Sequence, residues 1–383
     1  MNKNLLDVKP SGIRKFFSIA EEMDNVISLG VGEPDFLTPW NIRSVGINSL
    51  EKGATRYTAN AGLRELREEI CRYNQRKYEL DYDPNTEALV TVGGSEAIDM
   101  CIRTMVCPGD EVLIVEPSFV CYKPIVEVSG GVAVPLITRR ENQFKLTAAE
   151  LSRAITAKTK LLILPFPNNP TGAVMRREDL EAIAAVIREA DIFVLSDEIY
   201  SELTFGRATH VSIASLDGMK ERTVIANGFS KTFSMTGWRL GYALGPAPVI
   251  EQMTKLHQFA IMSAPTTSQF AAIEALRNTD ECVREMLEEY DMRRRYVVNA
   301  FNEMGMDCFE PEGAFYCFPS IQSTGLTSNE FCERLIHSQR VAVVPGDAFG
   351  ECGEGFVRVS YCYSISNLKE AMKRIRLFLD ELG

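Results

Sequence analysis

Short apolar runs alternate with amphipathic segments from about residue 64 to residue 229. In residues 95–106 the apolar side chains fall at positions 98, 101, 102, 105 and 106, the spacing of one helical face. Apolar runs of this length predict strands, and their alternation with helices predicts a parallel sheet covered on both faces. The expected strands are 88–94, 111–117, 160–167, 191–196 and 223–229, and the expected helices are 64–79, 95–106 and 177–190.

The pattern changes at about residue 276. A long charged segment with helical spacing is followed by short alternating runs and a final amphipathic helix, which is typical of an α+β unit. The expected elements are a helix at 281–304, strands at 313–320, 341–346 and 356–362, and a helix at 366–382. We therefore predict an α/β fold with a large domain, 46–278, and a smaller α+β domain made of 1–45 and 279–383.

Composition narrows the class of protein. The formal charge is 41 − 52 = −11 over 383 residues, which disfavours nonspecific binding to nucleic acid or to an anionic membrane. The N-terminus lacks the apolar core of a signal peptide, and the longest apolar runs, such as 161–166, are too short to span a bilayer. The ten cysteines form no C-x-x-C pair and the three histidines lie far apart, so we expect reduced thiols, no metal site and a cytoplasmic location.

The residues with candidate chemical roles lie just past the carboxyl ends of the predicted strands, where ligands bind in parallel sheets. Lys231 comes just after the strand at 223–229, in a turn rich in Ser, Gly and Thr, and Arg239 lies eight residues further on. A lysine amine forms a Schiff base with an aldehyde when its pKa is depressed, and a nearby arginine would depress it and also bind a phosphate. The alternative is an exposed loop lysine.

Three other strand ends carry polar residues. Asp197 ends the strand at 191–196, where it would pair with a protonated ring nitrogen or cap a helix. Asn169 lies in the turn FPNNPTG, where it either donates a hydrogen bond to a ligand or belongs to a plain turn. The peptide bond between Asn169 and Pro170 can be cis or trans, and the sequence does not decide between them. Gly94 and Ser95 open a helix, where backbone N–H groups suit a phosphate, and Glu96 would have to point away from that phosphate.

Taken together, these segments resemble the class I/II aminotransferases of pyridoxal-5′-phosphate (PLP) fold type I. The order of the motifs G-EPDF, RYT---G, GG-EA, NNPTG, SDEIY, SK-------R and R-S is far more specific than any one of them, and they extend from 28–36 to 356–361. The resemblance is greatest to the bacterial aromatic and N-acetyl-diaminopimelate aminotransferases. It implies a mostly parallel sheet between helices, a smaller α+β domain, and PLP as the cofactor.

The resemblance also implies a role for each site residue. Lys231 would form the Schiff base and then move the Cα proton. Arg358, an arginine in a buried strand that needs an anion, would hold the substrate α-carboxylate; the alternative is an internal carboxylate. Gly32 would let the backbone approach the substrate. The remaining roles are Asp197 on the pyridine nitrogen, Tyr200 and Asn169 on the 3′-oxygen, Phe119 stacked on the ring, and Gly94, Ser95, Ser230 and Arg239 on the phosphate.

Tyr57, in RYTANAG, would reach the phosphate of a neighbouring subunit, which implies a homodimer with shared active sites. We predict transfer of the α-amino group of an aromatic or broad-range L-amino acid to a 2-oxo acid, with 2-oxoglutarate as acceptor. The alternatives are an N-acyl-diaminopimelate aminotransferase, a PLP-dependent C–S β-lyase and a non-catalytic PLP-binding regulator, although the chain has no spare basic domain for the last. The sequence leaves the preferred side chain of the substrate open. Candidates for an apolar pocket are Phe16, Phe17, Tyr122 and Phe349, and Arg14 is a candidate for binding a side-chain carboxylate.

Overall fold

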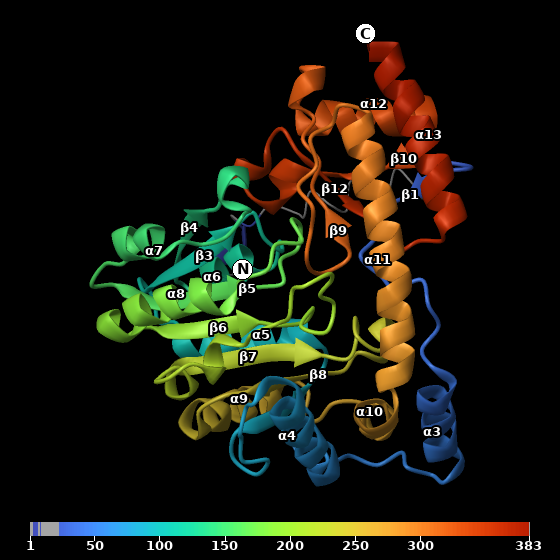
Figure 1. Cartoon of the computed structure of the whole chain (residues 1–383). Helices are drawn as coiled ribbons and strands as arrows, with labels where there is room; N and C mark the ends of the chain where they lie inside the picture. Colours follow the sequence, from blue (N-terminus) through green and yellow to red (C-terminus); the bar gives the residue numbers. More distant parts are fainter. Residues whose placement is uncertain (1–2, 7, 9–22, 383) are drawn as a thin grey trace.

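The centre of the molecule is a seven-stranded sheet with the strand order β2-β8-β7-β6-β5-β3-β4 (Figure 1). The structure is a computed structural model that describes residues 3–6, 8 and 23–382. Neighbouring strands from β4 through to β7 run parallel, and β8 runs antiparallel to both β7 and β2. The strands are β2 (Ala88–Thr91), β3 (Glu111–Glu116), β4 (Val132–Ile137), β5 (Thr159–Pro165), β6 (Phe193–Asp197), β7 (Thr223–Gly228) and β8 (Gly241–Leu244).

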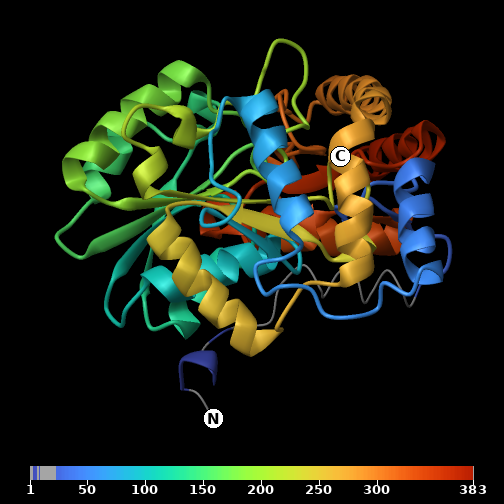
Figure 2. The same cartoon turned by 90° about the horizontal axis from the view of Figure 1, so that it is seen from below.

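Successive side chains of the inner strands enter two different cores. In β3, Leu113 and Val115 pack into one apolar cluster with Leu180 and Ile183 of α8 (Arg177–Ala190). Val112 and Ile114 point to the other face, which is covered by α5 (Gly94–Met105), α6 (Tyr122–Val128) and α9 (Ala247–Ala260). Because both faces are covered, the four central positions of β3, Val112 to Val115, are all apolar. Figure 2 shows the sheet between the two helical layers.

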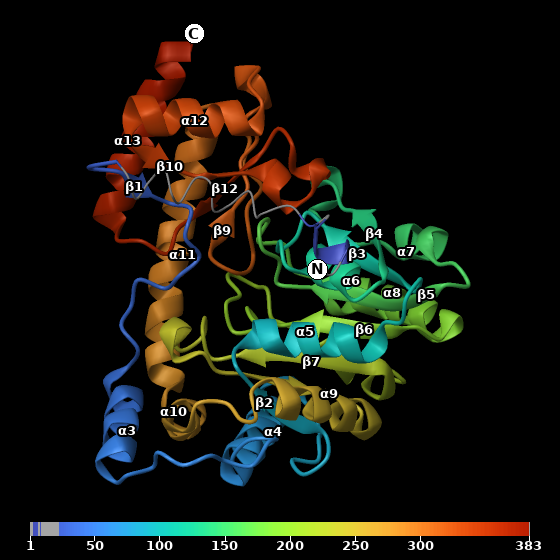
Figure 3. The ribbon, with the colours of Figure 1, turned by 180° about the vertical axis from the view of Figure 1, so that it is seen from behind.

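A second group of elements lies beside the carboxyl ends of the strands (Figure 3). Its strands β11, β12 and β9 form an antiparallel sheet, and the N-terminal strand β1 pairs in parallel with β10. The long helix α11 runs alongside both groups. The elements of this second group are β1 (Ile27–Ser28), β9 (Tyr316–Cys317), β10 (Val341–Ala342), β11 (Val344–Pro345), β12 (Val357–Ser360), α11 (Asp280–Glu303), α12 (Ser328–Gln339) and α13 (Ile365–Leu382).

The predicted fold class is confirmed, and the differences are local. Two strands of the large sheet were not predicted: β4 lies at an edge and is partly exposed, and β8 has four residues. The expected strands at 313–320 and 341–346 are shorter than predicted or split. The domain boundaries at 46 and 278 stay a prediction. The other helices are α1 (Lys3–Leu6), α3 (Trp40–Glu51), α4 (Arg64–Tyr78), α7 (Ala148–Ala154) and α10 (Thr266–Asn278).

Candidate active site

The carboxyl ends of β2, β3, β5, β6 and β7 meet at one edge of the sheet, and a cavity of about 290 Å³ lies there. This volume is near the lower end of the range for small-molecule sites. Eleven of the twelve predicted site residues line the cavity, although they come from segments spread over most of the chain. They are Gly32, Gly94, Ser95, Phe119, Asn169, Asp197, Tyr200, Ser230, Lys231, Arg239 and Arg358.

Lys231 lies on the connection between β7 and β8, and its side chain enters the cavity. Its Nζ donates a hydrogen bond to the carbonyl oxygen of Gly32 at 2.6 Å. Burial lowers the pKa of the Lys231 ammonium to about 8, and the positive charges of Arg358 and Arg239 act in the same direction. A lysine with such a pKa is partly neutral near pH 7, which is what reaction with an aldehyde requires.

Asp197 is the last residue of β6, and its carboxylate is buried among uncharged donors. Oδ2 accepts a hydrogen bond from the Tyr122 hydroxyl at 2.6 Å, and Oδ1 accepts one from the N–H of Ile199 at 3.2 Å. Burial raises the pKa of Asp197, and these two hydrogen bonds partly oppose the rise. A cationic partner in the cavity would stabilise this carboxylate. Tyr122 was expected as a pocket wall; its ring does line the cavity, but its hydroxyl is bound to Asp197.

Tyr200 faces a residue that the sequence analysis missed. Its hydroxyl lies 2.9 Å from that of Tyr316, and both side chains are buried. Burial raises the pKa of Tyr316 to about 12, so its hydroxyl stays protonated. The Tyr316 hydroxyl lies against Gly32, where an added Cβ would come within 1.8 Å of the oxygen. Gly32 thus admits Tyr316, and the close substrate approach predicted for this glycine stays a prediction.

Arg358 lies on β12 and is 4% exposed. Its Nη1 donates to Asn169 Oδ1 at 2.9 Å and its Nη2 donates to the carbonyl of Gly30, while Nε has no hydrogen-bond partner in the described part of the chain. The guanidinium also lies over the rings of Tyr316 and Phe349, at 4.4 and 4.8 Å. No internal carboxylate is among these partners, so within the described residues the alternative reading of Arg358 finds no support. The bond between Asn169 and Pro170 is cis.

The other end of the cavity suits a phosphate. Helix α5 begins at Gly94, so its first N–H groups face this end, with Ser95 and Ser230 beside them. Gly93 has φ +77°, and an added Cβ would lie 2.6 Å from an Arg239 nitrogen. Arg239 donates to the carbonyl of Thr236 at 2.8 Å, which leaves other N–H groups of its fork for an anion.

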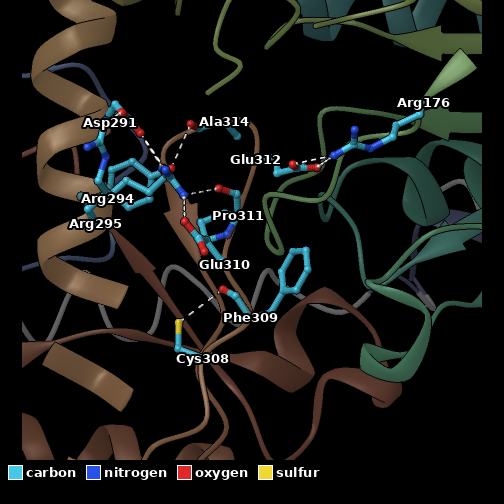
Figure 4. Close-up of polar contacts among 11 residues, drawn as sticks. Arg176, Asp291, Arg294, Arg295, Cys308, Phe309, Glu310, Pro311, Glu312 and Ala314 are labelled. Carbon is cyan, nitrogen blue, oxygen red and sulfur yellow. Dashed lines mark hydrogen bonds and ion pairs between the residues drawn. The ribbon is translucent and has the colours of Figure 1, made fainter. Parts of the chain in front are cut away.

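Residues 308–314 form a strap that ion pairs join to α11 and to Arg176 (Figure 4), and its backbone contacts the end of the Asn169 turn. Arg294 of α11 binds the carboxylate of Glu310 at 2.7 Å, and Arg176 binds that of Glu312 at 2.7 Å. The backbone N–H groups of Glu312 and Gly313 both donate to the carbonyl of Gly172, at the end of this turn. The strap leads into β9, so it fixes Tyr316 relative to Asn169.

The remaining candidates lie elsewhere. Tyr57 is 81% exposed and does not line the cavity. Arg14, Phe16 and Phe17 lie outside the described residues. The ten cysteines are free thiols in the structure. Within the part of the chain that the structure describes, no helix is long and apolar enough to cross a membrane, and no three metal-ligating side chains gather.

The family model for aminotransferases of class I and II matches residues 24–375. The chain belongs to this family, whose members depend on PLP, and it is an aminotransferase. YugH of Bacillus subtilis, which carries a provisional aminotransferase name, is 52% identical over 97% of this chain and 96% of its own. The aspartate aminotransferase of Pyrococcus abyssi is 47% identical over 100% of this chain and 98% of its own. The crystal structure of the aromatic aminotransferase from Pyrococcus horikoshii matches with a TM-score of 0.92, at 46% identity over 96% of this chain and 99% of that one.

The cavity fits PLP by the chemistry of its donors. Lys231 is an amine with a lowered pKa, Asp197 is a buried carboxylate bound by neutral donors, and Arg239 faces a helix N-terminus. An aldehyde, a protonated ring nitrogen and a phosphate are the three groups that these residues complement. The predicted family, cofactor and aminotransferase activity are confirmed. The roles of single residues stay predictions.

Proposed function

We propose that the enzyme transfers the α-amino group of an aromatic or other apolar L-amino acid to a 2-oxo acid, with 2-oxoglutarate as acceptor. The observation that carries this proposal is Arg358. It is a buried cation whose described partners include no carboxylate, and it lines the same cavity as the lysine amine. Such a cation is costly unless an anion reaches it, and the α-carboxylate common to both substrates is that anion.

The chain's residues then divide the work. Arg358 holds the carboxylate with its planar fork, which fixes the direction of the Cα–H bond. Lys231, as a neutral amine, would accept the Cα proton of the substrate and give it up again to complete the transfer. Asp197 would hold a protonated ring nitrogen of PLP, and the Tyr122 hydroxyl keeps the Asp197 carboxylate in place. PLP, when bound, supplies the conjugated ring that takes up the electron pair left at Cα.

The lining of the cavity favours apolar substrates. The lining includes Val31, Ile98, Phe119 and Ile199, and Arg239 and Arg358 are its arginines within the described residues. With these two assigned to the phosphate and the α-carboxylate, no other guanidinium among the described lining residues is left for a side-chain carboxylate. The relatives do not decide the matter, because their names include both aspartate and aromatic aminotransferases.

We also propose a homodimer in the cytoplasm, in which Tyr57 completes the phosphate site of the second copy. Large apolar side chains stay exposed around α3 and the α9–α10 junction, next to Tyr57. Asn60 binds the carbonyl of Met262, and Thr266 binds that of Arg56, so residues 56–60 adjoin the α9–α10 junction, and α3 packs against α10. These exposed side chains are Leu37, Trp40, Tyr57, Phe259, Ile261 and Met262. Light scattering tests this proposal: a monomer at micromolar concentration would contradict it.

The test of the proposed reaction uses the PLP-loaded enzyme and single L-amino acids, with no oxo acid present. Absorbance follows the conversion of the pyridoxal form into the pyridoxamine form. We expect phenylalanine and tyrosine to convert the cofactor faster than aspartate, and Lys231→Ala to abolish the conversion. Faster conversion by aspartate would refute the apolar assignment. Release of pyruvate and ammonia from cystathionine, without conversion of the cofactor, would favour the lyase.

A further inference from the structure

A buried carboxylate lies directly behind the proposed phosphate site. Glu96 is in the first turn of α5, next to Ser95, and its side chain is 8% exposed. One of its oxygens accepts a hydrogen bond from the N–H of Val92, and the other lies 2.9 Å from Nδ1 of His257. Gly94 and Ser95 line the cavity, but Glu96 does not. Its carboxylate therefore points away from the cavity, as the phosphate prediction required.

The hydrogen bond to Glu96 is the one hydrogen bond of the His257 ring among the described residues. His257 lies on α9, which packs against α5, and it is 0% exposed. Its Nε2 has no hydrogen-bond partner in the described part of the chain. A buried ring with an unsatisfied nitrogen costs stability, and an apolar residue would fill the same space at lower cost. The benefit of this histidine is therefore to be sought at Glu96.

The electrostatic problem at Glu96 is specific to a phosphate. A carboxylate at a helix N-terminus is favourable in the protein alone, because the helix dipole is positive there. The same carboxylate repels a phosphate dianion bound to the same turn, and burial strengthens the repulsion because screening is weak. The other acidic residue near this turn, Asp99, is paired with Arg103 at 2.9 Å.

We propose that His257 is a positioning residue for the phosphate of PLP. It binds the Glu96 carboxylate, holds it against Val92 and reduces its negative potential, so that the N–H groups of Gly94 and Ser95 bind the phosphate. This inference rests on the phosphate role proposed above for Gly94, Ser95 and Arg239. It makes a charge-specific demand: removing His257 is harmful only while Glu96 keeps its charge and the ligand keeps its phosphate.

The experiment measures dissociation constants of the apoenzyme for PLP and for pyridoxal, which lacks the phosphate, by absorbance titration. We expect His257→Leu to weaken PLP binding by about tenfold, the scale of one hydrogen bond to a charged group. Pyridoxal binding should stay within about twofold, which is under 0.5 kcal/mol. Adding Glu96→Gln to His257→Leu should restore PLP binding to within about threefold of the unmodified enzyme.

Two outcomes would overturn the inference: unchanged PLP binding in His257→Leu, or equal weakening of PLP and pyridoxal. If His257→Leu does not fold, the double variant still decides, because it buries no unpaired carboxylate and should fold and bind PLP normally; weak PLP binding by it would refute the idea. Arg239→Met separates this inference from the proposed function. If Arg239→Met binds PLP normally, the phosphate site itself is wrong; if it loses PLP while His257→Leu does not, the His257 inference alone fails.

Discussion

Replacement of Arg358 by methionine tests whether this residue serves the ligand or the fold. The change keeps a long apolar stem and removes the charge. In the apoenzyme it relieves the burial of a cation, which costs several kcal/mol. It also removes hydrogen bonds to Asn169 and Gly30, each worth about 1.5–3 kcal/mol, and stacking on two rings, worth about 2 kcal/mol.

These contributions have opposite signs and similar size, so we expect the free energy of unfolding of the apoenzyme to change by no more than about 2 kcal/mol. Urea unfolding measures it. Breaking a buried ion pair instead costs about 3–5 kcal/mol, because the partner charge is left alone. A loss of that size would show that Arg358 serves the fold, and it would refute the reasoning that links Arg358 to the substrate.

Arg358→Met should reduce the rate of catalysis strongly, although it should change the stability of the apoenzyme little. Loss of a buried charge-assisted contact to the substrate carboxylate costs about 3–4 kcal/mol, or a hundredfold to a thousandfold in kcat/KM for the amino-acid half-reaction. Arg358→Lys keeps the charge but loses the fork and should fall between the two. Arg239→Met is the matched control in the same cavity, since it should weaken PLP binding and leave the carboxylate contact intact. Wild-type kcat/KM in a folded Arg358→Met enzyme would exclude the proposed role.

Two further predictions follow from buried groups. The pKa of Lys231 is about 8 against an ordinary 10.5, which makes the neutral fraction of its amine about 300-fold larger at pH 7. The rate at which the apoenzyme captures PLP, measured by stopped flow, should therefore rise with pH up to about 8 and then level off. A rate that continues to rise to pH 10 would contradict this. Tyr122→Phe should lower the free energy of unfolding of the apoenzyme by about 1.5–3 kcal/mol, because it removes a donor to the buried Asp197, and should slow the half-reaction. Tyr290→Phe is its control in urea unfolding, since the buried Tyr290 hydroxyl has no partner among the described residues and its loss should cost little; equal effects of the two changes would refute the assignment.

The sequence predicts best what depends on short stretches of chain. The inner strands were located to within a few residues because their central positions form continuous apolar runs, and the polar residues at their carboxyl ends were recognised for the same reason. Contacts between distant residues were not predictable. Tyr122 and Asp197 are 75 positions apart, Tyr200 and Tyr316 are 116, and neither pair has a local signal. Glu96 was expected to avoid the phosphate, but its partner His257 lies 161 positions away on another helix.

The unpredicted strand β8 explains why Lys231 and Arg239 both reach the cavity. Lys231 follows the carboxyl end of β7, and Arg239 precedes the amino end of β8. Parallel neighbours are joined by a crossover, which would carry the chain to the opposite edge of the sheet before the next strand begins. Because β8 is antiparallel, with Gly228 opposite Gly241, the connection leaves and re-enters the sheet at the same edge. A single loop therefore supplies both the amine and the phosphate-binding guanidinium. An all-parallel sheet would have had to take the second of these residues from another segment.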